Sequence, residues 1–144
     1  MQNIQIKLGD WRSLQQQAQT IRTEVFVLEQ QVPQELEWDE MDARSLHALA
    51  YSTDKHPIGT GRLLPDGHIG RMAVLQLERG HGAGAAILHA LMRAARERGD
   101  TAVMLHAQIH AAGFYQKFGF ERVGEEFLEA GIRHVAMRCN LLPL

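Results

Sequence analysis

Cysteine is almost missing from this sequence, which has only Cys139, so no disulfide can form within the chain. Long apolar runs are also missing, because no stretch approaches the roughly 20 residues that span a bilayer. The first residues, MQNIQIKLGDW, have neither the basic leader nor the apolar run of an export signal. These absences predict a cytoplasmic protein without a membrane span. The alternating pattern around Cys139 predicts a packed or edge thiol in a late strand rather than a nucleophile.

Neither sign of charge dominates the chain. It carries 15 basic and 17 acidic side chains, a net charge of −2, and its basic residues form no long run. This balance argues against nucleic acid and membrane surfaces as partners. A length of 144 residues predicts a single domain over residues 1–144, because the chain is too short for two enzyme-sized domains.

The segment RGHGAG, residues 79–84, places three glycines where a helix should begin. Apolar residues then recur at intervals of three and four, which predicts an amphipathic helix that ends before Gly99. Each glycine weakens a helix by roughly 0.5–1 kcal/mol relative to alanine, but it also uncovers the first-turn N–H groups that bind anions. The segment is therefore interpreted as a pyrophosphate cradle flanked by Arg79. A tight turn, in which the glycines only supply positive φ or close packing, is the alternative.

Two other nucleotide motifs can be compared with the same segment. The phosphate loop of nucleotide hydrolases needs lysine and then serine or threonine, whereas Ala85 and Ala86 follow here. The dinucleotide fingerprint is formally met by Gly80, Gly82 and Ala85, but the next strand ends in His106 and lacks the acid expected about 20 residues on. A nicotinamide-binding fragment is therefore the weaker alternative.

The remaining periodicities predict an α/β fold with a mixed sheet. A helix over residues 11–30 should bury one stripe, and the acidic segment 34–45 should form a loop with a short helical turn at most. Three strands should then form an antiparallel meander, and the strand after the glycine-headed helix should lie parallel. The predicted buried stripe consists of Leu14, Ala18, Ile21, Val25 and Leu28. The predicted strands cover residues 3–8, 45–52, 56–65, 67–75, 101–107, 120–128 and 132–141, with a short helix over 110–118.

This order, with RGHGAG heading the central helix, resembles the Gcn5-related N-acetyltransferase (GNAT) family over nearly the whole chain. Arg79, Gly82 and Gly84 match the coenzyme A signature Q/R-x-x-G-x-G/A, and AAGFYQKFGFERVGE resembles the family's tyrosine-bearing helix. RTEVFVLEQQVPQELEWDEMD is similar to the amino-terminal segment of a bacterial subgroup whose substrates are mostly unassigned. The resemblance implies a GNAT-like fold, with a largely antiparallel mixed sheet of about seven strands flanked by helices.

The resemblance also implies how acetyl-CoA binds. The pyrophosphate would lie on backbone N–H groups of the glycine segment, and the pantetheine arm would pair with the preceding strand, which must splay from the strand over 101–107. Gln108 stands where the family often has asparagine, so its longer amide is the expected pantetheine contact. The expected cofactor-binding residues are Met72, Ala73, Val74, Arg79, Gly80, His81, Gly82, Ala83, Gly84, Gln108 and Tyr115.

Acetyl transfer needs an oxyanion donor, an acid for the thiolate and a neutral amine. A backbone N–H near Val74 is the expected oxyanion donor. By resemblance Tyr115 is the general acid, with packing alone as the alternative; its ordinary pKa of about 10 leaves it protonated. Candidate bases are His106, Glu29 and Asp42, and transfer without a base is the alternative. The spacing of His106 and His110 allows two zinc ligands on one helix, but we predict no metal site because these residues fall on a strand and the next helix.

The acceptor pocket is expected near the amino-terminal helix. Its predicted substrate-binding residues are Arg22, Phe26, Glu29 and Asp42. The acids between Glu35 and Asp42 either attract a cationic amine or form a solvated loop. The expected activity is direct transfer of acetyl from acetyl-CoA to a primary amine of a small molecule or protein, by a monomer or a homodimer. A non-catalytic acyl-CoA-binding module is the alternative.

Overall fold

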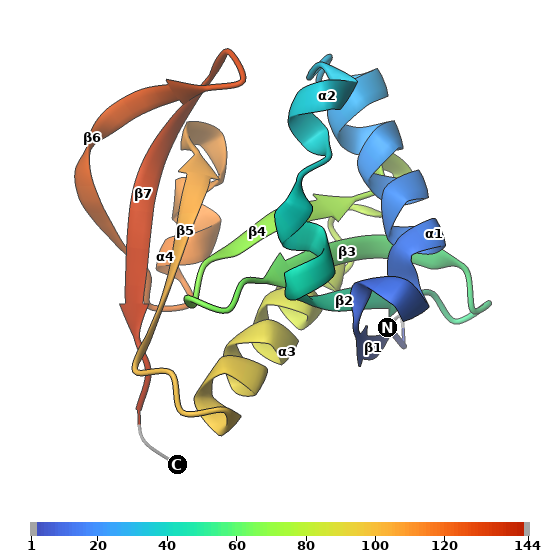
Figure 1. Cartoon of the computed structure of the whole chain (residues 1–144), viewed down its shortest axis with the longest axis horizontal. Helices are drawn as coiled ribbons and strands as arrows, with labels where there is room; N and C mark the ends of the chain where they lie inside the picture. Colours follow the sequence, from blue (N-terminus) through green and yellow to red (C-terminus); the bar gives the residue numbers. More distant parts are fainter. Residues whose placement is uncertain (1–2, 143–144) are drawn as a thin grey trace.

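The computed structural model describes residues 3–142, and its strands form two antiparallel sheets (Figure 1). The first sheet has the order β1-β2-β3-β4 and the second has the order β5-β7-β6. The first comprises β1 (Gln5–Gly9), β2 (Leu46–Tyr51), β3 (Pro57–Leu63) and β4 (Ile69–Val74). The second comprises β5 (Ala102–Gln108), β6 (Glu121–Glu129) and β7 (Ile132–Asn140).

One parallel bridge joins the two sheets. It pairs His68, just before β4, with Met104 of β5, and the Met104 N–H donates to the carbonyl of Gly67 at 3.1 Å. Within residues 3–142 no further pair links β4 to β5. The predicted mixed, largely antiparallel arrangement of seven strands is confirmed. The nicotinamide alternative is wrong because it needs a doubly wound parallel sheet.

Helices cover both faces of the first sheet (Figure 1). The Asp10 carboxylate caps α1 by accepting the Ser13 N–H at 2.9 Å. On the other face α3 packs closely against β3. A Cβ atom at Gly61 would lie only 2.8 Å from the Ile87 side chain, so glycine allows this close approach. Gly99, with φ of +97°, follows the end of α3 as predicted. The amino-terminal helical segments are α1 (Trp11–Arg22), η1 (Thr23–Glu29), α2 (Gln34–Glu37) and η2 (Glu40–Arg44). The later ones are η3 (Gln76–Glu78), α3 (Ala83–Glu97), η4 (Ile109–Ala111) and α4 (Ala112–Gln116).

The predicted apolar stripe of the first helix holds until Val25 and is wrong at Leu28, which is 69% exposed. The reason is η1, a π-helix of seven residues that follows α1 without a break. A π-turn holds more residues than an α-turn, so the phase of the stripe rotates away from the core. The acidic segment also differs from its prediction, since it forms the two short helices α2 and η2.

The buried side chains form two clusters on opposite faces of the first sheet. The larger lies between α3 and both sheets and includes Leu88, Val103 and Phe120; the smaller lies under α1 and includes Leu14 and Leu49. Cys139 of β7 belongs to the larger cluster, as a packed thiol should. None of the helices within residues 3–142 is long and apolar enough to cross a membrane.

Candidate active site

The candidate site begins at a bulge in β4. Thr60 pairs with Ala73 and Arg62 pairs with Gly70, so two residues of β4 lie opposite Gly61 of β3. The first of the two, Arg71, has φ of +48°. A bulge bends its strand and increases the local twist, and β4 separates from β5 along this stretch. The predicted splay of the two strands is therefore built into the backbone, although the first bulged residue is an arginine rather than a glycine.

The backbone of Val74 faces the gap that the splay opens. Val74 lies opposite Gly59, and the N–H of the next residue, Leu75, donates to the carbonyl of Ile58 at 2.9 Å. In an antiparallel ladder this pattern makes Val74 and Gly59 a non-hydrogen-bonded pair, so the Val74 N–H and C=O point away from β3. The Val74 carbonyl accepts the Nε–H of Arg79 at 2.9 Å. The N–H is directed toward the same side, as an oxyanion donor should be.

The glycine segment forms an open loop before α3. Gly80 and Gly82 have φ of +84° and +93°, and a Cβ built at either would meet no heavy atom within 4 Å. Gly82 is the N-cap of α3 and makes no side-chain capping bond, so the N–H groups of the first turn point past a residue without a side chain. At Gly84 a Cβ would lie 3.6 Å from Phe114 of α4. The loop is thus a turn that needs positive φ and also a helix N-terminus that suits a phosphate.

The guanidinium of Arg79 does not extend freely from this loop. Its NH1 and NH2 groups contact the two carboxylate oxygens of Glu29 at 2.7 and 2.8 Å. This pairing lowers the pKa of Glu29. Glu29 of η1 is therefore linked to the loop before α3, and it is a poor proton acceptor because the arginine stabilises its ionised form.

The opposite side of the gap is formed by β5 and α4. The Gln108 amide, at the end of β5, donates to the side-chain oxygen of Gln30 at 3.0 Å, so a side chain bridge runs from β5 to the end of η1. Tyr115 of α4 packs against the rings of Phe114 and Phe120, with centroids 5.1 and 5.9 Å away. Burial raises the pKa of Tyr115 to about 12. The tyrosine therefore keeps its proton at neutral pH.

His106 lies near the closed end of the splay. It follows the bridged Met104 by two residues, so continuing the parallel register would place it opposite Gly70. Its ring is 44% exposed, and its Nδ1 atom lies 2.9 Å from a carboxylate oxygen of Glu129 in β6. The ring of Phe127 packs edge-on against it, with centroids 5.0 Å apart. The pair with Glu129 was not predicted, because the two residues are 23 positions apart in sequence. They meet only because of the order of the strands in the second sheet.

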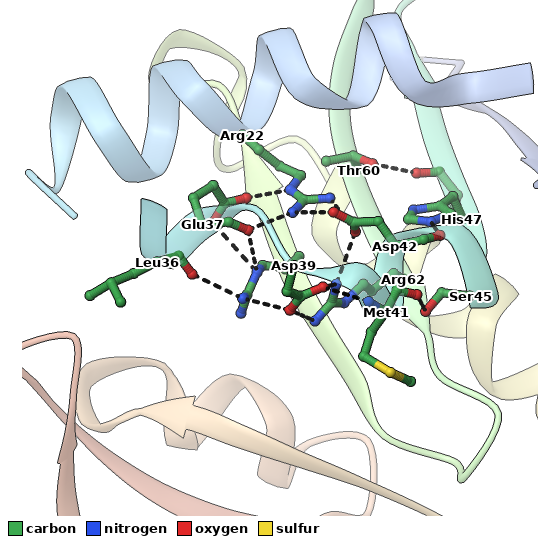
Figure 2. Close-up of polar contacts among 12 residues, drawn as sticks. Arg22, Leu36, Glu37, Asp39, Met41, Asp42, Ser45, His47, Thr60 and Arg62 are labelled. Atoms are coloured by element: carbon green, nitrogen blue, oxygen red, sulfur yellow. Dashed lines mark hydrogen bonds and ion pairs between the residues drawn. The ribbon is translucent and has the colours of Figure 1, made fainter. Parts of the chain in front are cut away.

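The acidic segment does not form the predicted exposed cluster. Glu37 and Asp42 are each only 3% exposed and point inward, as Figure 2 shows. The reason is electrostatic: Arg22 donates to Asp42 at 2.8 Å and pairs with Glu37, while Arg62 pairs with Asp39 at 2.7 Å and Asp42 at 2.9 Å. Desolvating two carboxylates is tolerable only when cations accompany them.

Arg22 is the centre of this network rather than an open pocket residue. Its side chain is 1% exposed, and its guanidinium stands 5.3 Å from the Trp11 ring centroid and 5.6 Å from that of Trp38. Phe26 is half-buried against the smaller core cluster. The structure therefore separates the predicted substrate-binding residues, since Glu29 reaches the glycine loop while Arg22 and Asp42 are enclosed. The sequence did contain one signal of this buried network, because Arg22 lies beside the apolar stripe of the first helix.

Residues 12–141 match the family described as the acetyltransferase (GNAT) domain. The uncharacterized N-acetyltransferase YjcF of Bacillus subtilis is 43% identical over 121 residues, which cover 81% of this chain and 86% of YjcF. An acyl-CoA N-acyltransferase structure from Pseudomonas aeruginosa has a TM-score of 0.83 at 31% identity, covering 95% of this chain and 99% of that one. Escherichia coli ElaA has a TM-score of 0.83 at 28% identity, with 95% and 99% covered.

Proposed function

Because the chain belongs to the GNAT acetyltransferase family, we propose that it transfers the acetyl group of acetyl-CoA to a primary amine of a small molecule or a protein. One observation carries the proposal: a glycine loop at a helix N-terminus stands at the end of a strand whose backbone groups at Val74 face a splayed gap. Acetyl-CoA is an intracellular metabolite, so the proposal assigns the reaction to the cytoplasm.

Acetyl-CoA would be held mainly by backbone groups. The N–H groups of Gly80, His81, Gly82, Ala83 and Gly84 would bind the pyrophosphate, since the loop presents no side chain at its glycines. The pantetheine amides would pair with β4 at Met72, Ala73 and Val74, as an added strand does. The Arg79 side chain would have to leave the Val74 carbonyl if a pantetheine N–H is to take that acceptor. Gln108 and Tyr115 would contact the arm from the other side of the gap.

The reaction we propose passes directly from thioester to amide. The amine nitrogen forms a bond to the acetyl carbon, the Val74 N–H stabilises the resulting oxyanion, and the carbon–sulfur bond then breaks. Tyr115 gives its proton to the departing thiolate, and a base takes the proton that the amine loses. A covalent acyl-cysteine is not part of the scheme, because burial raises the pKa of the one cysteine, Cys139.

His106 is the base that the described residues favour. Glu29 is held by Arg79 and Asp42 is held by two arginines, so neither carboxylate is available to an amine. His106 is exposed at the gap, and a neutral ring with its hydrogen on Nδ1 donates to Glu129 and leaves Nε2 to accept a proton. Phe26 and the exposed face of η1 are the proposed border of the acceptor site.

The test is a thiol-release assay with acetyl-CoA and a panel of primary amines. We expect release that depends on an amine, and a strong loss of turnover in His106→Gln. The matched control is His56→Gln, since His56 lies in the exposed turn between β2 and β3. If acetyl-CoA binds but no amine of the panel increases thiol release, the alternative of a non-catalytic acyl-CoA-binding module is favoured.

A further inference from the structure

Arg71 occupies a backbone conformation that its side chain disfavours. It has φ of +48° at the first bulged position of β4, where one common type of bulge places glycine. Side chains with a Cβ are strained in this region, and such strain persists only where surrounding contacts impose it. Contacts of the Arg71 side chain must therefore hold the backbone in this conformation.

The Arg71 guanidinium is bonded to the end of α2 and to the segment that connects α2 with η2. Its Nε–H donates to the carbonyl of Glu37 at 3.3 Å, and its NH2 group donates to the carbonyl of Leu36 at 3.3 Å and to Asp39 at 3.1 Å. The Glu37 carboxylate adds an ion pair at 3.5 Å. We call these four contacts the Arg71 clamp.

Two further arginines hold the residues that Arg71 contacts. Arg22 binds the Glu37 carboxylate and carbonyl, and Arg62 binds both oxygens of Asp39, so the segment that Arg71 grips is fixed to α1 and β3 (Figure 2). Arg71 itself is partly exposed, with 26% of its side chain accessible. The rigid network therefore reaches β4 at the bulge.

We propose that Arg71 is a positioning residue: its clamp holds the β4 bulge in place and thereby sets the direction of the Val74 backbone beside the acetyl-CoA slot. The identification of acetyl-CoA as the ligand rests on the proposed function. The geometry supports the link because the single bridge to β5 within residues 3–142 lies at His68, just before β4 and its bulge, and Val74 follows the bulge by two residues. Without the clamp, a residue with a Cβ should relax to extended backbone, and the register beyond it should shift.

The proposal is tested by comparing Arg71→Ala with Arg71→Gly. Both variants lose the clamp, but glycine tolerates the φ of +48° that alanine disfavours. We expect Arg71→Ala to weaken acetyl-CoA binding by about tenfold or more in calorimetry, and Arg71→Gly to bind within a few-fold of the wild type. Equal losses in both variants would mean that the side chain contacts the ligand, and two unchanged affinities would mean that the clamp does not position the site. Either result overturns the proposal. Arg44→Ala, at an exposed arginine of η2, is the control.

A second measurement keeps the test independent of ligand binding and of poor folding. The Leu75 N–H, bonded to Ile58 beyond the bulge, should exchange faster with solvent in Arg71→Ala and stay protected in Arg71→Gly. If Arg71→Ala does not fold, Asp39→Asn weakens the clamp more gently, and adding Arg71→Gly should restore Leu75 protection. No restoration overturns the proposal. Failure of the wild type to bind acetyl-CoA would instead contradict the proposed function.

Discussion

Replacing Arg22 with methionine should destabilise the protein severely, because the guanidinium satisfies two buried carboxylates at once. It donates to Asp42 at 2.8 and 3.1 Å, to the Glu37 carbonyl at 3.0 Å and to the Glu37 carboxylate (Figure 2). Methionine fills much of the volume but provides no donor. The variant therefore leaves the acids buried with fewer cations around them.

The size of the loss in the free energy of unfolding depends on the cations that remain beside the two carboxylates. Breaking a buried pair by removing one partner costs about 3–5 kcal/mol. Asp42 keeps Arg62 at 2.9 Å and Glu37 keeps Arg71 at 3.5 Å, so the lower end of that range applies. The cation–π contacts with Trp11 and Trp38 add about 0.5–1 kcal/mol each. We expect a total loss of about 4–5 kcal/mol in the free energy of unfolding.

Urea unfolding followed by tryptophan fluorescence measures this loss, with Arg44→Met as the matched exposed control, expected within about 0.5 kcal/mol of the wild type. An Arg22→Met loss below about 1 kcal/mol would refute the argument. If acceptor KM rose while stability stayed unchanged, Arg22 would border the acceptor pocket, as the sequence alone suggested.

Two further predictions concern single side chains. Tyr115→Phe should leave the Kd for acetyl-CoA unchanged and lower turnover by roughly a hundredfold. It should also remove the tyrosinate absorbance step near pH 12. Unchanged turnover, with the chemical step rate-limiting, would exclude Tyr115 as the acid. Burial lowers the pKa of His47 below its ordinary 6.5, so below that pH the unfolded chain takes up a proton that the folded chain refuses, and stability falls as pH falls. His47→Gln should flatten the pH dependence of the free energy of unfolding in urea below pH 6.5, and an unaltered slope would contradict the assignment.

Local signals in the sequence were sufficient for most of the fold. The glycine at position 99 and the apolar spacing before it predicted α3, because helix capping and periodicity depend on neighbouring residues only. The turn signals around Pro57 and Gly67 predicted the meander for the same reason. The glycine loop and Tyr115 were also proposed as site residues from local motifs.

Features set by distant contacts were not predicted. The acidic segment looked solvated because its arginine partners stand 15–35 positions away along the chain. The bulge has no sequence signal at Arg71 itself, since the bulge type that can be recognised from sequence has glycine at this position. Leu28 was misplaced because the π-helix that rotates it leaves the apolar spacing of an α-helix intact up to Val25.

Calorimetric titration of the wild type and of Gly82→Val with acetyl-CoA tests the central claim most directly. Gly82 has φ of +93° and open space at its Cβ, so valine there strains the loop and covers the N–H groups of the α3 N-terminus. The account predicts saturable binding by the wild type, and loss of that binding in a Gly82→Val protein whose circular dichroism is unchanged. A wild type that does not bind acetyl-CoA, or a folded Gly82→Val that binds it equally well, would contradict the account.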